Sequence, residues 1–397
     1  MSHTKKILIM ACMIVVAMAS AIPAAYAVSP RITAVSALLM DAGSGQILYQ
    51  KNGFVRKEPA SLTKVITAII ALEYSHPEEV ATISKKTANI SVGQELGLKT
   101  GDRITVENLI KAALMYSAND STVAIAEHLA GTEERFVELM NAKAVVLGAL
   151  NTRFANTNGY HSPNHYSTAY DLAQLTRYAL TNPDFARIIS TPKDTIHWAD
   201  GDKKREVNNT NRLVREDSYQ GILGVKTGST IRAGNCLIAA AKRGDRTLIA
   251  VVLHSRNRYR DAVNILDYGF DKMVPVKLCQ KGDSFGNLSV AGGVKDCVET
   301  VSQEEINIYL AEEDRDKVTV RVLPQKPLQA PVSPRQKVGT AVFTLGKTEL
   351  ARVNLIASEG VEKPGFLHKI KMKMAGHAYI YPPSEQLFRA ILPGKLS

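Results

Sequence analysis

Residues 59–72 read Pro-Ala-Ser-Leu-Thr-Lys-Val-Ile-Thr-Ala-Ile-Ile-Ala-Leu, and this stretch predicts both a buried helix and a reactive site at its start. The segment 64–72 is apolar on nearly every side, which is typical of a helix lying in a protein core. Ser61 stands where this helix begins, so its hydroxyl and backbone N–H lie at the positive end of the helix dipole. Lys64 lies one turn further along, on the same face. Burial among apolar neighbours would lower the pKa of the Lys64 amine and allow it to act as a base.

Three short motifs, Ser-x-x-Lys among them, recur in the chain, and their context selects one copy of each. Ser-x-x-Lys also occurs at Ser2/Lys5, Ser-x-Asn at Ser117/Asn119, Ser162/Asn164 and Ser255/Asn257, and Lys-Thr-Gly at Lys99 and at Lys226. Ser117 lies in a break between two predicted helices, where side chains can face a cleft. The Ser162 copy contains a proline typical of a turn, and the Ser255 copy ends a strand. Lys226 precedes two strongly apolar strands, which predicts a position at a sheet edge, whereas Lys99 precedes a helix.

The elements around these motifs predict a mixed α/β (α+β) domain over residues 28–272. A hairpin is expected at 36–49, and the last two strands at 236–241 and 248–253. The expected helices are 102–116 with Thr105 as N-cap, 123–129, 168–180 ending at Asn182-Pro183, and 262–270. Short β-rich runs between turns then predict a small all-β, sandwich-like domain over 273–375.

The first residues of the chain carry a signal for export, and the last ones bear on membrane contact. Lys5 and Lys6 precede an apolar run at 7–21, and Ala25-Tyr26-Ala27 supplies the small residues of a cleavage site. This order predicts a signal peptide over 1–27; an uncleaved membrane anchor is disfavoured because the run is short. In the tail 376–397, the apolar residues of 387–392 suit either a short amphipathic helix on a membrane surface or a simple packed or disordered tail.

The net charge of the chain indicates its binding partners, and its cysteines and histidines bear on disulfides and metal sites. The formal net charge is +11, and a basic protein outside the cytoplasm is drawn to anionic lipid and cell-wall polymers. Nucleic acid is not expected, because export separates the chain from it and the basic residues are scattered. Cys236 is expected in a buried strand, while the spacing of Cys279 and Cys297 leaves a disulfide open. We expect no metal and no cofactor, since Pro163 separates His161 from His165 and no zinc spacing occurs.

The selected motifs stand in one order, with 56 residues from Ser61 to Ser117 and 109 from Ser117 to Lys226. The order of these motifs resembles that in the low-molecular-mass penicillin-binding proteins of the D-alanyl-D-alanine carboxypeptidase family. The sequences of four segments share the resemblance: 92–94, 109–130, 165–172 and 224–230. The resemblance covers about 35–270 strongly. It implies a penicillin-binding transpeptidase/β-lactamase-like domain, peptidoglycan stem peptides as substrates, and β-lactam antibiotics as covalent inhibitors. The predicted signal peptide places the protein outside the cytoplasm, periplasmic or extracytoplasmic, and on the outer face of the cytoplasmic membrane if the tail attaches.

The resemblance implies a role for each motif residue on the reacting side. Ser61 attacks the carbonyl between the two terminal D-alanines, and Lys64 accepts its proton. Ser117 relays a proton to the leaving amine, and Asn119 holds the substrate amide. The backbone N–H groups of Ser61 and Ser229 form the oxyanion hole.

The third motif is implied in binding the carboxylate end of the substrate. Lys226 and Thr227 bind the terminal carboxylate, and Gly228 lets the substrate backbone approach the strand. Lys226 would also lower the pKa of Lys64 further. Family members often carry histidine where this chain has Ser229, which leaves substrate preference and turnover open. Either Arg256 or Arg258 is expected to assist with the carboxylate.

Three alternatives compete with a carboxypeptidase. A class A β-lactamase needs a deacylating glutamate after the second motif, and residues 148–193 contain none. A D,D-endopeptidase of the same family would use the same chemistry on a different peptide, although such relatives tend to lack the second domain. A non-catalytic cell-wall binder or sensor would keep the fold, but it would not need the complete set of motif residues.

Overall fold

The computed structural model describes residues 29–365, which form two compact units. The first unit comprises residues 30–277 and 307–310, and the second comprises residues 278–306 and 311–365. The predicted signal peptide at 1–27 and the predicted tail at 376–397 lie outside the described residues. No helix within 29–365 is long and apolar enough to span a membrane.

The first unit is built on an antiparallel sheet of five strands in the order β2-β1-β9-β8-β7. Their bounds are β1 (Ser36–Asp41), β2 (Ile47–Lys51), β7 (Ile222–Thr230), β8 (Gly234–Arg243) and β9 (Arg246–Ser255). Two-stranded sheets add β3 (Val80–Thr82) with β4 (Arg103–Thr105), and β5 (Lys193–His197) with β6 (Lys204–Asn208). The expected hairpin and both expected apolar strands are therefore confirmed, and β7 is an edge strand.

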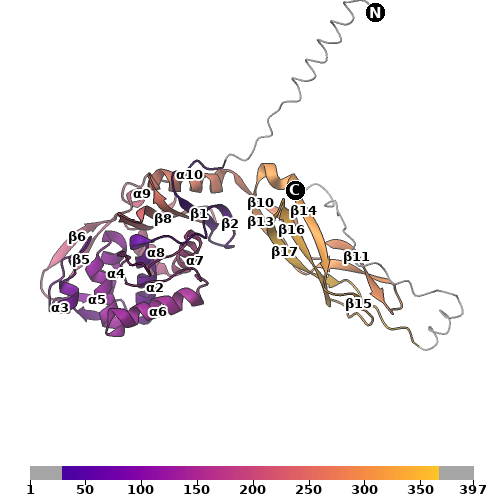
Figure 1. The fold of residues 1–397 in the computed structure, drawn as a ribbon, viewed down its shortest axis with the longest axis horizontal. Coiled ribbons are helices and arrows are strands. Elements are labelled where there is room, and N and C mark those ends of the chain that lie inside the picture. The colour runs from indigo at the N-terminus through magenta and orange to yellow at the C-terminus, as the bar shows by residue number, and fades with distance from the viewer. Residues whose placement is uncertain (1–28, 366–397) are drawn as a thin grey trace, which may run out of the picture. The chain divides into compact units, whose positions relative to one another are not determined.

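Helices lie on both faces of this sheet, as Figure 1 shows for α10 on one side and α2 and α7 on the other. The helices are α2 (Lys64–Tyr74), α3 (Lys85–Ala88), α4 (Val106–Lys111), α5 (Asn119–Ala130), α6 (Glu133–Val146), α7 (Ala169–Ala179), α8 (Pro183–Ser190), α9 (Arg212–Arg215) and α10 (Arg258–Asp271). Alternate strand residues face opposite ways. Leu38, Ile238 and Val251 therefore join the main core around α2, while Leu39 and Leu248 face Gly269 of α10.

The apolar helix expected from the sequence is confirmed as the centre of that core. Every residue of α2 from Lys64 to Ala71 is buried. Ser61 lies just before it in a 3-10 turn, η1 (Ala60–Thr63), rather than in the α-helix itself. Thr105 caps α4 as predicted, by accepting a hydrogen bond from the backbone N–H of Asn108.

The second unit consists of β-strands apart from one short 3-10 helix. Its six-stranded sheet has the order β14-β16-β17-β12-β11-β15, and its core includes Val298, Val338 and Ala357. The strands of the sheet are β11 (Ser284–Ala291), β12 (Cys297–Ser302), β14 (Val318–Pro324), β15 (Leu328–Gln329), β16 (Lys337–Leu345) and β17 (Thr348–Ala357). The chain also forms a two-stranded sheet of β10 (Met273–Cys279) and β13 (Ile306–Ala311), and the 3-10 helix η3 (Glu312–Lys317).

Two features differ from what the sequence predicts or leaves open. Helix α7 ends at Ala179, as predicted, but a second helix begins at once: the Asn182 side chain caps α8, in which Pro183 takes the first position, where its missing N–H costs nothing. The disulfide left open between Cys279 and Cys297 is absent, and both thiols are free. Cys236 is buried in β8, as expected.

Candidate active site

Ser61 and Lys64 meet at the start of α2. The Lys64 Nζ lies 2.9 Å from Ser61 Oγ, and it also donates to Asn119 Oδ1 at 2.7 Å and to the Asn158 carbonyl at 2.9 Å. The Lys64 side chain is completely buried. Burial first, and then the charge of Lys226, hold the pKa of Lys64 well below its ordinary value, as the sequence predicts. An uncharged amine beside a serine hydroxyl can accept the proton of that hydroxyl.

Ser117 and Asn119 come from the break between α4 and α5. A turn of π-helix, η2 (Ala112–Tyr116), ends at Ser117, which has a left-handed backbone with φ of 68°. Such a backbone is costly for a residue other than glycine, and such strain is frequent at functional sites. Helix α5 then begins at Asn119, whose Nδ2 donates to the Val92 carbonyl at 2.5 Å. Asn119 therefore ties Lys64 to the segment around Val92.

Strand β7 supplies the third group of residues. The Lys226 Nζ donates to Ser117 Oγ at 2.9 Å and to the Thr227 carbonyl at 3.0 Å. Lys226 is buried, and burial together with the nearby charge of Arg258 lowers its pKa to about 7. The Thr227 hydroxyl donates to Thr210 Oγ1 at 2.8 Å. A buried cation at the edge of a sheet is a strong site for an anionic group, since water does not screen it.

Gly228 is where β7 passes closest to the Ser61 turn, η1. A Cβ atom at Gly228 would lie 3.1 Å from Ser61 N and from the Cβ atom of Ala60. Glycine is therefore needed for this close approach. Ser229 follows on the same strand, and its hydroxyl donates to Asn235 Oδ1 at 3.1 Å.

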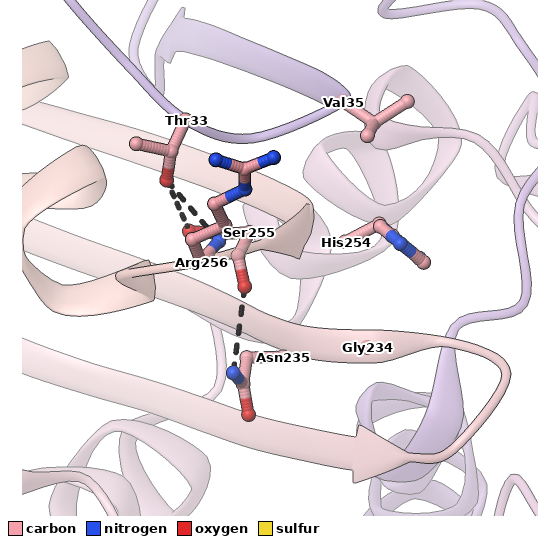
Figure 2. A pocket seen from close by; sticks show the side chains of 7 residues that line it. All are labelled: Thr33, Val35, Gly234, Asn235, His254, Ser255 and Arg256. Atoms are coloured by element: carbon pink, nitrogen blue, oxygen red, sulfur yellow. Dashed lines mark hydrogen bonds between the residues drawn. The ribbon is translucent and has the colours of Figure 1, made fainter.

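The structure distinguishes the two arginines that the sequence leaves open. Arg258 donates from Nη1 to the Gly228 carbonyl at 3.0 Å, so its charge lies beside β7. Arg256 contacts Thr33 through its backbone N–H instead. Arg256 also lines a pocket of about 520 Å³ together with Asn235 and His254, shown in Figure 2. None of the three motifs lines that pocket.

Seven of the eight residues singled out from the sequence are thus brought to one place by direct contacts, and Ser229 follows them as the next residue of β7. The hydrogen bonds of Lys64 connect Ser61 to Asn119, those of Lys226 connect Ser117 to Thr227, and Gly228 lies against the Ser61 turn. Each group comes from a different element, as a cleft lined by three motifs requires. The copies of the motifs at Ser162, Ser255 and Lys99 take no part in these contacts.

Sequence reasoning missed several groups that hold this arrangement. Asn158 offers a backbone carbonyl to Lys64, which any residue type could supply, so no sequence signal marks it. Asp120 accepts backbone N–H groups of residues 96–98 and 121, and thereby holds the segment that includes Leu96. His165 bonds to Thr63 inside the core. The sequence shows that His165 lies three residues before Thr168, the N-cap of α7, but it does not show that the imidazole bonds to Thr63.

A serine hydroxyl beside a buried lysine with a lowered pKa, in an α/β domain with a β domain after it, defines the class of serine-type peptidases that bind penicillin. The sequence profile of the D-alanyl-D-alanine carboxypeptidases matches residues 23–257, and that of the C-terminal domain of penicillin-binding protein 5 matches residues 275–363. The chain belongs to the D-alanyl-D-alanine carboxypeptidase family. The family and fold expected from the motifs are confirmed.

Curated relatives and solved structures agree with this assignment. The chain is 33% identical to the D-alanyl-D-alanine carboxypeptidase DacF of Bacillus subtilis, over 85% of this chain and 88% of DacF. The structure of DacD from Francisella tularensis matches with a TM-score of 0.72 at 26% identity, covering 85% of this chain and 97% of that one. A mutant of the Streptomyces K15 DD-transpeptidase matches with a TM-score of 0.59 at 32% identity, covering 61% of this chain and 99% of that one.

Proposed function

We propose that the protein is a serine-type carboxypeptidase that removes the terminal D-alanine from peptidoglycan pentapeptides through an acyl-enzyme on Ser61. One observation carries the proposal: the fully buried Lys64 amine, with its lowered pKa, lies 2.9 Å from Ser61 Oγ, within reach of the serine proton. A serine hydroxyl is a weak nucleophile unless a neighbouring base takes its proton. Lys64 is such a base, because desolvation has already disfavoured its charged form.

In the first half of the reaction, Ser61 Oγ bonds to the carbonyl carbon between the two D-alanines, and its proton passes to Lys64. The negative charge that develops on the carbonyl oxygen is stabilised by the backbone N–H groups of Ser61 and Ser229. The C–N bond then breaks, and the proton that Lys64 accepted passes through the Ser117 hydroxyl to the leaving amine, which leaves Lys64 uncharged again; Ser117 Oγ lies 2.9 Å from Lys226 Nζ. Asn119 orients the substrate amide. Water then attacks the ester carbonyl and gives a proton to Lys64; the bond to Ser61 Oγ breaks, and Lys64 returns the proton to Oγ, which regenerates Ser61 and Lys64.

The free carboxylate of the substrate is bound on β7. Lys226 supplies charge, the Thr227 hydroxyl turns from Thr210 to donate a hydrogen bond, and Arg258 adds charge beside the strand through its bond to the Gly228 carbonyl. This requirement for a C-terminal carboxylate is what makes the enzyme a carboxypeptidase. A β-lactam presents a carboxylate and a strained amide in the same way, but its leaving amine stays tethered, so the acyl-enzyme persists.

The test combines labelling with product analysis. The wild type should gain the mass of one penicillin after brief exposure and should release free D-alanine from a pentapeptide ending in D-Ala-D-Ala. Ser61→Ala should lose both properties while keeping its melting temperature. Labelling that persists in this variant would move the nucleophile elsewhere. Cleavage of cross-linked dimers without D-alanine release would favour the D,D-endopeptidase.

Export and attachment complete the proposal. Cleavage after Ala27 would release residues 28–397 outside the cytoplasm, where the substrate is, and the basic charge would favour contact with anionic lipid and cell-wall polymers. The tail at 376–397 is proposed as a peripheral contact with the membrane. The division into domains at 272/273 and 375/376 also stays a prediction. Cell fractionation with and without the residues after 383 checks the attachment.

A further inference from the structure

The peptide group between Ala60 and Ser61 is held in an unusual orientation. Ala60 has a φ of 50°, a conformation that costs on the order of 1–3 kcal/mol for a residue with a side chain. Its carbonyl accepts a hydrogen bond from the Thr63 hydroxyl at 2.9 Å. In a trans peptide group the C=O and the N–H point in opposite directions. Because Thr63 holds the carbonyl on one side, the Ser61 N–H is directed away from Thr63.

That N–H lies where the proposed reaction needs a donor. A Cβ atom at Gly228 would lie 3.1 Å from Ser61 N, so the nitrogen lies against β7. The acceptor position of an oxyanion hole must lie within hydrogen-bond distance of such an N–H. The Thr63 hydroxyl therefore controls the direction of a donor that it does not touch.

His165 determines which way the Thr63 hydroxyl points. The backbone N–H of Ala155 donates to His165 Nδ1 at 3.1 Å, so Nδ1 is an acceptor. A neutral imidazole has one acceptor nitrogen and one donor nitrogen, so Nε2 carries the proton. His165 Nε2 lies 2.8 Å from Thr63 Oγ1 and donates to it. The single proton of the Thr63 hydroxyl is then available for the Ala60 carbonyl alone.

The surroundings keep this histidine neutral. His165 is 2% exposed, and the Phe154 ring packs edge-on against it with centroids 5.6 Å apart. Burial, and then the nearby charge of Lys64, lower the pKa of His165 to about 4. Besides Lys64, the polar groups that face the imidazole are the Thr63 hydroxyl and the Ala155 N–H. An imidazolium would lose the bond from Ala155, so the arrangement depends on the neutral form.

Gly159 closes off the same carbonyl group. A Cβ atom at Gly159 would lie 1.8 Å from the Ala60 oxygen and 2.9 Å from Thr63 Oγ1, and Gly159 has a φ of +89°. Only glycine can pack there. The Ala60 carbonyl therefore has little freedom to rotate, and its hydrogen-bond partner is decided by Thr63 and His165.

We propose that Thr63 and His165 are positioning residues, which aim the Ser61 N–H into the oxyanion hole through the Ala60–Ser61 peptide group. Neither residue contacts the substrate. The inference rests on the proposed function, in which this N–H stabilises the charge that develops on the substrate carbonyl. Its contribution is therefore expected in the transition state and not in substrate binding.

A matched pair of variants tests this proposal. Thr63→Val removes the hydroxyl at nearly constant volume, and Thr63→Ser keeps it. Loss of an entire oxyanion donor lowers kcat about 10²–10³-fold, so a donor that is misdirected should cost about 10–100-fold. We expect Thr63→Val to lower kcat for the pentapeptide by that factor with KM within twofold of wild type, and to weaken a peptide boronic acid, which mimics the tetrahedral state, by a similar factor. Thr63→Ser should stay within threefold in all three measurements.

The outcomes separate the two proposals. A wild type that neither reacts with penicillin nor releases D-alanine defeats the proposed function, whatever the variants do. An active wild type with a folded Thr63→Val variant that keeps kcat within twofold overturns the positioning role, and so does an equal loss in Thr63→Ser. If Thr63→Val does not fold, Thr63→Ala, which only removes atoms, is read by the same criteria. His165→Gln, which retains a donor, should keep more activity than His165→Leu, and equal activities of the two would also overturn the role.

Discussion

The Gly228→Ala substitution adds one methyl group where β7 passes the Ser61 turn. That methyl carbon would lie 3.1 Å from Ser61 N and from Ala60 Cβ, and 3.2 Å from the Pro59 carbonyl oxygen. Ordinary contacts of a methyl carbon are 3.5–4.0 Å, so either β7 or the turn must move by several tenths of an ångström. The turn resists, because Gly159 and the Thr63 hydroxyl enclose the Ala60 carbonyl.

The magnitude follows from how sensitive a positioned reaction is to distance. A misplacement of about 1 Å can cost 10²-fold in rate, so a shift of several tenths should cost roughly tenfold, and a partly covered Ser61 N–H should raise the loss toward 100-fold. This corresponds to about 1.4–2.7 kcal/mol in the activation free energy. Stability should fall by about 1–3 kcal/mol as well, since the added methyl overpacks the contact.

The assay is the second-order rate constant for acylation by a fluorescent penicillin, measured with the release of D-alanine from the pentapeptide and with thermal unfolding. Gly43→Ala is the matched control, because the nearest atom to its added methyl is Asp41 Oδ1 at 3.4 Å and its backbone has no positive φ. The control should behave as wild type. Acylation by a folded Gly228→Ala variant within twofold of wild type would refute the close contact as a functional constraint.

Two further predictions concern pH. Because the pKa of Lys226 is lowered to about 7, its charge is lost as pH rises through that value, and kcat/KM for a substrate with a free carboxylate should decline on the alkaline side. Lys226→Arg keeps its charge at these pH values and should lose this decline; an unchanged profile would contradict the assignment. The pKa of His165 is lowered from 6.5 to about 4, so the unfolded chain binds this proton first as pH falls. Stability from this group is complete above pH 6.5 and should fall by about 3 kcal/mol by pH 4, measured by urea unfolding. His165→Gln should remove this part of the slope, and an identical slope in wild type and variant would be the contrary result.

Some elements could be predicted because their signal is local. Helix α2 is apolar on every side, and β8 and β9 are apolar on both faces, as elements covered on both sides must be. Helix α6 gives a much weaker signal, because only Phe136, Met140 and Ala144 are buried along it. Helix α6 could therefore not be predicted from its sequence. Pro183 marks the end of α7 in the sequence, but a proline is equally suited to the first position of the next helix, so the start of α8 could not be predicted from it.

The sequence by itself determined which chemical groups are present. It also determined the proximity of Ser61 and Lys64, because side chains three residues apart at the start of a helix are neighbours wherever the helix lies. Only the tertiary structure decided what those groups can do. The lowered pKa of Lys64 arises from burial by residues far apart in the chain and from Lys226, which lies 162 residues away. The carbonyl that Lys64 contacts belongs to Asn158. Because every residue type has a backbone carbonyl, no sequence motif predicts this contact. Hydrogen-bond direction and desolvation are properties of the packed chain, and they exist only once the three motifs share one site.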